Sequence, residues 1–509
     1  MKTNTYPLIA AALFGLLTAC TSIPDDLGQS DVDALLSDRG IQTPDESQVD
    51  SKEYIESLSS EAITADSAVR IALANNPKLK TMYADLGIAA ADVYEAGRIH
   101  NPIFHYSNLD SDESGESNLE TFGLVTSFTS LITLPSRKRY AEGEFERVKE
   151  LVAADVLEIV TETENAYYDY VAAEQMASVQ SQISKAGYLS FELAKRYEKA
   201  GNLSPREFLE EQIIASETKL ESLDASADAY EKRSELVNLL GFSLGQSLDV
   251  FTQLPVPVSE EDDLDTLIEL ARNSRLDYSA AHKNADLLAN KLGVTNWTRW
   301  LGELDIGIEH EQETDGAELT GPTFEWEVPI FSQNRDSKLR ANAELQIAIA
   351  DVKRLDVEVE NDVRLAHAAV LNAKERINEY ENGLLPARID DVARAQEEEN
   401  FMLIGTFELL DVKRDEYEAY LGYLSSIKDY WHGRVELSRA VGNTLPSANL
   451  VGSSHINIED YLVPKSTGMD HSGHNMEHPG EEMDHSGHNM ESDSPSSSEK
   501  DEHDAHQHH

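Results

Sequence analysis

The residues best suited to chemistry gather in the segment 464–509, which is rich in Ser, Gly, Asp, Glu, His and Met. The octapeptide Met-Asp-His-Ser-Gly-His-Asn-Met occurs there twice, at 469–476 and at 483–490. Its thioether sulfur atoms favour Cu(I) and, by the same softness, Ag(I), whereas imidazole also binds Cu(II), Zn(II), Ni(II) and Co(II). The candidate ligands are Met469, His471, His474, Met476, His478, Met483, His485, His488, Met490, His503, His506, His508 and His509. The sequence therefore predicts a disordered tail that binds copper or silver first, with a solubilising tail of incidental metal affinity as the alternative.

The only cysteine, Cys20, directly follows a short apolar run at residues 6–17. The run is shorter than the ~20 residues that span a bilayer, so we interpret residues 1–19 as a signal peptide. The string Leu-Thr-Ala-Cys resembles a bacterial lipobox, which implies cleavage before Cys20 and acylation of that residue. Two or three acyl chains would anchor the N-terminus firmly in a membrane. An ordinary secretory signal with an incidental cysteine is the alternative.

The charge of the chain excludes nucleic acid as a partner. Lys and Arg number 42 against 94 Asp and Glu, which gives a formal net charge of −52. Such a surface repels phosphates. Most of the acids lie outside the tail, and an acid-lined tunnel would favour cations. A saline habitat with an acidic proteome accounts for the same charge. The single cysteine also excludes a disulfide framework and a multi-cysteine zinc site.

The body of the chain is a duplicated unit. The string Leu73-Ala-Asn-Asn-Pro-Lys-Leu79 returns at 270–276, an offset of 197, and Gly201-Asn-Leu returns as Gly405-Thr-Phe, an offset of 204. A period of this length indicates a repeated domain and not a solenoid. The predicted parts are a signal peptide (1–19), a lipidated N-terminal segment (20–65), a first repeat (66–254), a second repeat with a C-terminal equatorial segment (255–463) and the tail (464–509). Each repeat is predicted to contain a helix, two strands, a long helix and a further helix.

The predicted helices are unusually long. Between residues 349 and 380 apolar side chains recur every three or four positions, which is typical of a coiled-coil seam. A helix over residues 336–382 would measure about 70 Å at 1.5 Å per residue. On the helices alone, a compact soluble bundle is the alternative.

Four short segments alternate between apolar and polar residues. Segments 303–309 and 323–330 each have one apolar and one acidic face and are joined by the polar run 310–322, while about 101–109 and 120–132 are the candidate strands of the first repeat. Such strands are typical of a transmembrane β-barrel, although a soluble sandwich shows the same alternation. Four strands would leave open edges with unpaired backbone groups in lipid. We therefore expect three protomers to share one 12-stranded barrel.

The lipobox, the two repeats, the two hairpins and the two long helix pairs together resemble the TolC-type outer-membrane efflux factors of tripartite RND systems, over about residues 66–442. Two local strings agree, Ala72-Leu-Ala-Asn-Asn-Pro77 and Val328-Pro-Ile-Phe-Ser-Gln-Asn-Arg335, and the second is similar to the heavy-metal, CusC-like and CzcC-like branch. The resemblance implies a fold that is mainly α with a small β part. Each protomer would supply a long α-helical coiled-coil section and four transmembrane β-strands, completed as a 12-stranded barrel in a homotrimer.

The resemblance also implies a location and partners. The protein would be a lipid-anchored component of the outer membrane of a Gram-negative bacterium, with tunnel and tail in the periplasm. Thr21 directly after Cys20, in place of Asp, implies sorting to that membrane. Its partners would be outer-membrane lipid, a periplasmic adaptor (membrane fusion protein) and an inner-membrane RND pump.

In this family the tips of the helical hairpins carry Gly-x-apolar-Ser/Thr turns that meet the adaptor. The matching positions are Gly201, Leu203 and Ser204 at the first tip and Gly405 and Thr406 at the second, where Glu408 replaces the final hydroxyl residue. The alternative for both glycines is a helix end that requires a positive φ, and the two interpretations are compatible.

Asp411 falls on the position of the acids that ring the closed aperture in this family, and Arg414 stands at the next such position. Three converging copies of Asp411 would make the gate sensitive to pH and to divalent ions. The alternative is a solvated helix residue.

The hypothesis is a passive conduit, not an enzyme, that exports heavy-metal cations: copper and silver first, then zinc, cadmium and cobalt. No cofactor is required, and metal ions bound by the tail are cargo. No nucleophile–base pairing, phosphate-binding loop or closed zinc site stands in the sequence, and we interpret His100 and His105 as a barrel-rim pair. One alternative is the same channel exporting drugs, other organic compounds or a secreted polypeptide. Another is a lipid-anchored periplasmic protein that buffers metal.

Overall fold

The computed structural model describes residues 26–45, 47–49, 51–110, 117–245, 248–331, 333–456 and 458. Cys20 and the Met/His tail therefore lie outside the described residues. The chain divides into two units, Met1–Leu462 and Val463–His509.

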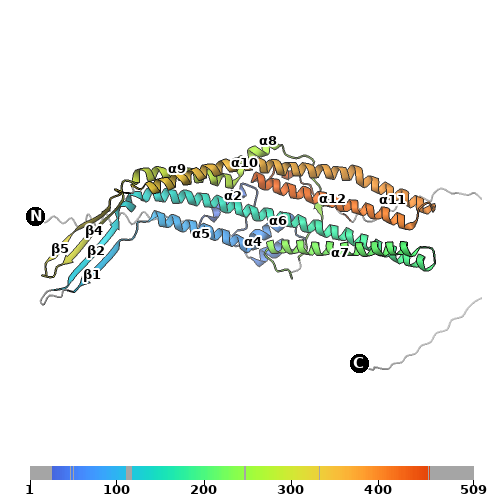
Figure 1. The fold of residues 1–509 in the computed structure, drawn as a ribbon, viewed down its shortest axis with the longest axis horizontal. Coiled ribbons are helices and arrows are strands. Elements are labelled where there is room, and N and C mark those ends of the chain that lie inside the picture. The colour runs from blue at the N-terminus through green and yellow to red at the C-terminus, as the bar shows by residue number, and fades with distance from the viewer. Residues whose placement is uncertain are drawn as a thin grey trace, which may run out of the picture. The chain divides into compact units, whose positions relative to one another are not determined.

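Long helices lie side by side in the first unit, and a small sheet extends from one end of them (Figure 1). The first half of the unit comprises α2 (Gln29–Ser37), α3 (Lys52–Leu58), α4 (Ala65–Asn75), α5 (Pro77–Gly97), β1 (Ile103–Leu109), β2 (Leu119–Ser127), α6 (Phe128–Lys199) and α7 (Pro205–Leu239). The second half comprises β3 (Leu254–Pro255), α8 (Leu264–Ser274), α9 (Leu276–Thr298), β4 (Glu303–Gln312), β5 (Glu318–Glu327), α10 (Arg335–Glu379), the π-helical turn η2 (Tyr380–Leu384), α11 (Leu385–Asn400), α12 (Thr406–Val441), the 3-10 turn η3 (Pro446–Leu450) and β6 (His455–Ile456). The structure is mainly helical with a small sheet part, as the sequence predicts.

Two helix pairs form the part of the unit that lies farthest from the sheet. Helix α6 has 72 residues, which at 1.5 Å per residue is about 110 Å, and it packs along α7. Helices α10 and α11 pack along α12 in the same way. The predicted seam is buried over its C-terminal part, where Val359, Val363 and Val370 are fully shielded from solvent. Within the described ranges, no helix combines the length and the apolarity needed to cross a membrane.

The long helix of the second repeat does not stop before Pro386. Five residues of η2 join α10 to α11 without a break, and Pro386, which has no amide hydrogen, follows this wider turn. The Tyr380 ring of η2 sits over Gly422 of α12, because a Cβ at Gly422 would come within 2.2 Å of the Tyr380 hydroxyl. The wider turn therefore passes α12 at a position where α12 has no side chain.

Four of the predicted strand boundaries are wrong. The predicted strand 120–132 ends at Ser127, because the Ser127 hydroxyl accepts a hydrogen bond from the Ser130 amide and begins α6. The predicted strand 323–330 runs from Glu318 to Glu327 and stops before Pro329, which has no amide hydrogen for a ladder. The predicted loop 310–322 shrinks to residues 313–317, a tight turn in which Gly316 has φ +87°.

Short segments wrap the middle of the helices, and we call residues 39–45, 250–263 and 443–456 the girdle. Trp431 of α12 donates its indole N–H to the Pro255 carbonyl at 2.8 Å. Thr444 donates to the Arg39 carbonyl at 2.6 Å, and β3 pairs with β6. The girdle thus ties the N-terminal segment, the inter-repeat linker and the C-terminal segment to one level of the helices.

Candidate functional site

The four-stranded sheet has the order β1-β2-β4-β5, and every neighbouring pair is antiparallel. The hairpins β1–β2 and β4–β5 meet along β2 and β4. Residues directly opposite one another share a face. One row therefore crosses all four strands through Phe104, Leu124, Ile308 and Pro322. Phe104, Leu124 and Ile308 are 51–64% exposed, so this face is a wide apolar surface that no described element covers.

The opposite face of the sheet is acidic at the end nearer the helices. Glu303 lies directly opposite Glu327, and Asp305 lies directly opposite Glu325. Like charges in such cross-strand positions are destabilising. Together these acids give this face a negative potential that attracts cations.

The first helical tip is a tight turn with a strong cap. Gly201 has φ +76°, which favours glycine, and its amide donates to the Glu198 carbonyl at 2.9 Å. The Ser204 hydroxyl accepts from the Glu207 amide at 3.2 Å, and the Glu207 carboxylate accepts from the Ser204 amide at 2.8 Å. This capping box stabilises the predicted turn at residues 201–204, in which Leu203 is half-buried.

The second tip is built differently. Gly405 has φ −86° and caps α12 in an extended conformation, while Met402 takes the positive φ of +56°. The expectation that Gly405 has a positive φ is therefore wrong, because Met402, three residues earlier, has the positive φ of this turn. Phe401, Met402 and Leu403 are 73–91% exposed, an apolar tip that the sequence analysis missed. Four successive large apolar residues at 401–404 between a helix end and a glycine were the available signal.

The two tips are neighbours. The rings of Tyr197, close to the first tip, and Phe407, in the first turn of α12, lie 6.1 Å apart in an edge-on contact. Thr406 donates to the Glu399 carboxylate at 3.0 Å, which closes the second turn. The two tips are therefore close enough for one partner to contact both.

Asp411 lies on α12 near the second tip, and its side chain is 52% exposed. Its carboxylate pairs with Arg414 at 2.9 Å, the residue that stands at the next aperture position. Asp415 is held by Arg388 of α11 at 2.9 Å. In one protomer the charge of Asp411 is thus locally balanced, and its predicted role in an aperture ring remains a prediction.

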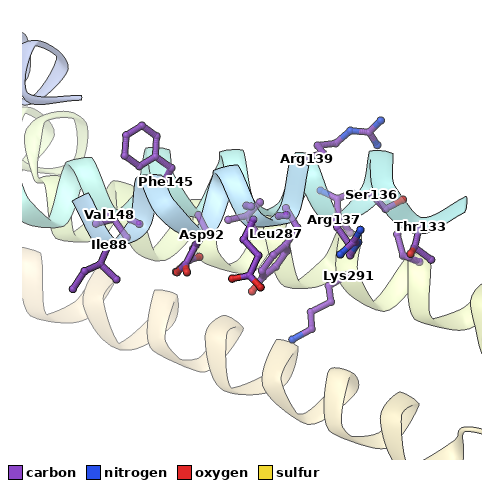
Figure 2. A pocket seen from close by; sticks show the side chains of 18 of the residues that line it. Ile88, Asp92, Thr133, Ser136, Arg137, Arg139, Phe145, Val148, Leu287 and Lys291 are labelled. Atoms are coloured by element: carbon purple, nitrogen blue, oxygen red, sulfur yellow. The ribbon is translucent and has the colours of Figure 1, made fainter. Parts of the chain in front are cut away.

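A groove of about 900 Å³ runs between α5, α6 and α9 on the helical side of the sheet (Figure 2). Its apolar lining includes Ile88, Val148 and Leu287, and Arg137 and Lys291 stand among its polar residues. His100 also lines it and contacts the Arg137 guanidinium at 2.9 Å, whereas His105 lies in β1 over Gly123. The two histidines therefore have different neighbours.

A second cavity, of about 500 Å³, lies under the girdle between α6 and α12. Glu164 lines it, half-buried near the Tyr168 and Trp431 rings, which stack 5.4 Å apart. Burial in this cavity, and to a lesser degree the charge of Asp66, raises the pKa of Glu164 to about 7.

The raised pKa of Glu164 predicts a pH-dependent stability. The folded state holds the proton more tightly than the unfolded state, so the stability falls as the pH rises from about 4.5 to 7. Glu164→Gln should therefore stabilise the protein by on the order of 2 kcal/mol at pH 8, and by nearly nothing at pH 4. Thermal unfolding of the detergent-solubilised protein at both pH values measures this. Glu217→Gln, an exposed α7 residue, is the control, and an equal gain at both pH values for Glu164→Gln would contradict the prediction.

No set of three or more His, Cys, Asp or Glu side chains within the described ranges is arranged to hold a metal ion. The predicted metal ligands all belong to the tail. Cys20 and these ligands lie outside the described residues, so their roles remain predictions.

This architecture is similar to that of known proteins. Residues 68–242 match the outer membrane efflux protein family. The CmeC outer membrane channel of Campylobacter jejuni has a similar structure, with a TM-score of 0.63 and 14% identity over 83% of this chain and 92% of that one. VceC, an outer membrane protein of Vibrio cholerae, gives 0.61 and 14% over 77% and 99%, and CusC gives 0.60 and 13% over 74% and 92%. No curated protein sequence matches. At these identities the likeness establishes the fold, and CusC is one of several similar channels.

Proposed function

We propose that this chain, with the fold of the outer-membrane efflux channels and a first repeat that matches their family, is the outer-membrane component of a tripartite efflux system. The observation that carries the proposal is the two-faced sheet. An apolar face that nothing covers and an acidic face continue directly into helices of up to 72 residues. Lipid would cover the first face, and the second would line a wet channel.

The channel is a homotrimer. Strands β1 and β5 are the edges of the sheet, and an open edge in lipid leaves backbone groups unpaired at a cost of several kcal/mol each. Three protomers with four strands each close a 12-stranded barrel. The flanking helices also need partners, because Leu209, Ile213 and Leu220 of α7 are 54–61% exposed. A neighbouring protomer would cover them.

The two tips would dock on a periplasmic adaptor, which connects the channel to an inner-membrane RND pump. The pump supplies the energy, so the channel itself is a passive conduit. Acylated Cys20 would anchor each protomer to the outer membrane of a Gram-negative bacterium.

The proposed cargo is heavy-metal cations, copper and silver first, followed by zinc, cadmium and cobalt. Two features support this choice: the paired acids of the sheet and the paired thioether and imidazole ligands of the tail. The tail would collect or relay ions in the periplasm, and no resident cofactor is needed.

Removing residues 464–509 tests the cargo. A deletion strain complemented with the tail-less protein should lose copper and silver tolerance relative to the full-length protein, and should keep its tolerance of dyes and detergents. A tail of unchanged length, with every Met and His replaced by Gln, separates ligand loss from truncation. Sensitivity of the deletion strain to organic compounds alone would overturn the metal assignment and favour export of drugs or of a polypeptide.

A metal-buffering lipoprotein is the competing class. A helical scaffold would conduct nothing in planar bilayers, whereas a trimeric channel gives unitary conductance steps. Equal conductance with and without the tail would place the tail outside the conduction path.

A further inference from the structure

Basic residues collect where the helices meet the sheet, in a chain that carries more than two acids for each base. We call this group the basic belt. Its members are Arg98, Arg137, Arg139, Arg299, Arg335, Lys338 and Arg340. Arg98 and Arg299 directly follow α5 and α9, and Arg335, Lys338 and Arg340 lie in the first two turns of α10. Arg137 and Arg139 lie about three turns into α6. These are the ends of the four helices nearest to the four strands (Figure 1).

The belt residues have no acidic partners. None of them forms an ion pair with another residue of the described part of the chain, although Lys138, which stands between Arg137 and Arg139, pairs with Glu142 at 3.7 Å. Arg137 contacts His100, and its buried Nε atom has no hydrogen-bond partner. These cations are therefore available to an anion from outside the chain.

Two of the belt residues are placed against the preference of their helix. Arg335 is the first residue of α10 and Lys338 follows in the same turn, where the positive end of the helix dipole disfavours cations. Asn334, directly before α10, makes no capping hydrogen bond to the helix and instead donates to the Arg299 carbonyl at 3.0 Å. This bond holds the basic end of α9 beside the basic start of α10.

Tryptophans lie beside the belt at the edge of the apolar face. Trp297 and Trp300 are each 52% exposed at the end of α9, and the Arg299 guanidinium lies 4.4 Å from the centre of the Trp300 ring. Trp326, on the apolar face, donates its indole N–H to the Leu301 carbonyl at 2.7 Å. Tryptophans and arginines that lie together beside an apolar surface are typical of a membrane interface.

We propose that the basic belt binds the phosphate groups of anionic phospholipids in the membrane leaflet that is nearer to the helices. This contact fixes the depth of the protein in the membrane. The proposal rests on the proposed function in one respect, that the apolar face of the sheet lies in lipid. Guanidinium groups bind phosphate with two parallel hydrogen bonds, and each basic residue near an anionic surface adds attraction that salt screens.

Quenching of tryptophan fluorescence by brominated lipids tests the belt, because Trp297, Trp300 and Trp326 lie next to it. Full-length protein is reconstituted in phosphatidylcholine vesicles that contain either brominated phosphatidylglycerol or brominated phosphatidylcholine. The wild type should associate with brominated phosphatidylglycerol about fivefold or more in preference to brominated phosphatidylcholine, as measured by quenching. High salt should reduce this preference. A triple variant should reduce the ratio of phosphatidylglycerol to phosphatidylcholine association to about one. It carries Arg335→Gln, Lys338→Gln and Arg340→Gln.

The control removes the same charge elsewhere, by Lys185→Gln, Lys219→Gln and Lys353→Gln on α6, α7 and α10, and should keep the wild-type preference. If the belt variant fails to assemble, the pair Arg98→Gln and Arg299→Gln takes its place. Equal quenching of the wild type by both lipids, or an equal loss in the control, overturns the proposal. Channel conductance is recorded in the same vesicles: conduction without lipid preference refutes the belt alone, whereas no conduction in either lipid refutes the proposed channel.

Discussion

Glu261→Ala should destabilise the protein by about 3–5 kcal/mol, because it leaves a buried guanidinium without its carboxylate. Glu261 of the girdle contacts Arg434 of α12 at 2.6 Å, and both side chains are 5% exposed. The same carboxylate accepts from the Tyr430 hydroxyl at 2.7 Å and contacts Lys374 of α10 at 3.2 Å. After the change, the Ser447 hydroxyl at 3.0 Å is the one hydrogen-bond partner left to the Arg434 side chain among the described residues.

The midpoint of thermal or denaturant unfolding in detergent measures this loss. The double variant Glu261→Ala, Arg434→Met should recover part of it, since it removes both buried charges. Glu260→Ala, at the exposed neighbouring position, is the control. A loss for Glu261→Ala no larger than that of the control would show that the girdle does not depend on this ion pair.

Neutralising the acidic face of the sheet should change selectivity and stability in opposite directions. The variant carries Glu303→Gln, Asp305→Asn, Glu325→Gln and Glu327→Gln. Because these acids face one another directly, their removal should stabilise the sheet by about 0.2–1 kcal/mol for each pair. The ratio of cation to anion permeability should fall by about an order of magnitude, as the fixed charges that concentrate cations disappear.

Reversal potentials in planar bilayers under a potassium chloride gradient measure the permeability ratio, and thermal unfolding measures the stability. Glu120→Gln with Glu318→Gln, near the hairpin turns and on the opposite face, should leave the ratio unchanged. An unchanged ratio in the four-residue variant would exclude the acidic face from the conduction path.

The sequence predicted the helices and the two hairpins because each depends on a local period. Apolar residues spaced by three or four, such as Val359, Val363 and Val370, bury one side of α10, and alternation places Ile308 and Glu309 on opposite faces. The strand ends were missed because they depend on single hydrogen bonds. Ser127 begins a helix within an apolar run that resembles a strand, and only its cap shows this.

The remaining features depend on contacts between distant segments. The turn at Met402 has a positive φ that favours glycine, so a sequence pattern assigns it to Gly405 instead. The groove and the girdle arise only when residues from separate parts of the chain meet, as Glu261 meets Arg434. The total charge of −52 also conceals the basic belt, since a sum says nothing about where the positive charges gather.

The π-helical turn η2 sets the rotational phase between α10 and α11. In a regular α-helix one added residue turns every later side chain by about 100°. A single wide turn can absorb one such residue locally, so the helix on each side keeps its own buried face. Ile377 before the turn and Leu385 and Ala395 after it are all buried, and both helices pack on α12. Residues 380–384 are thus the position in this rod where the chain can lengthen or shorten by one residue while the second tip continues to face the same way.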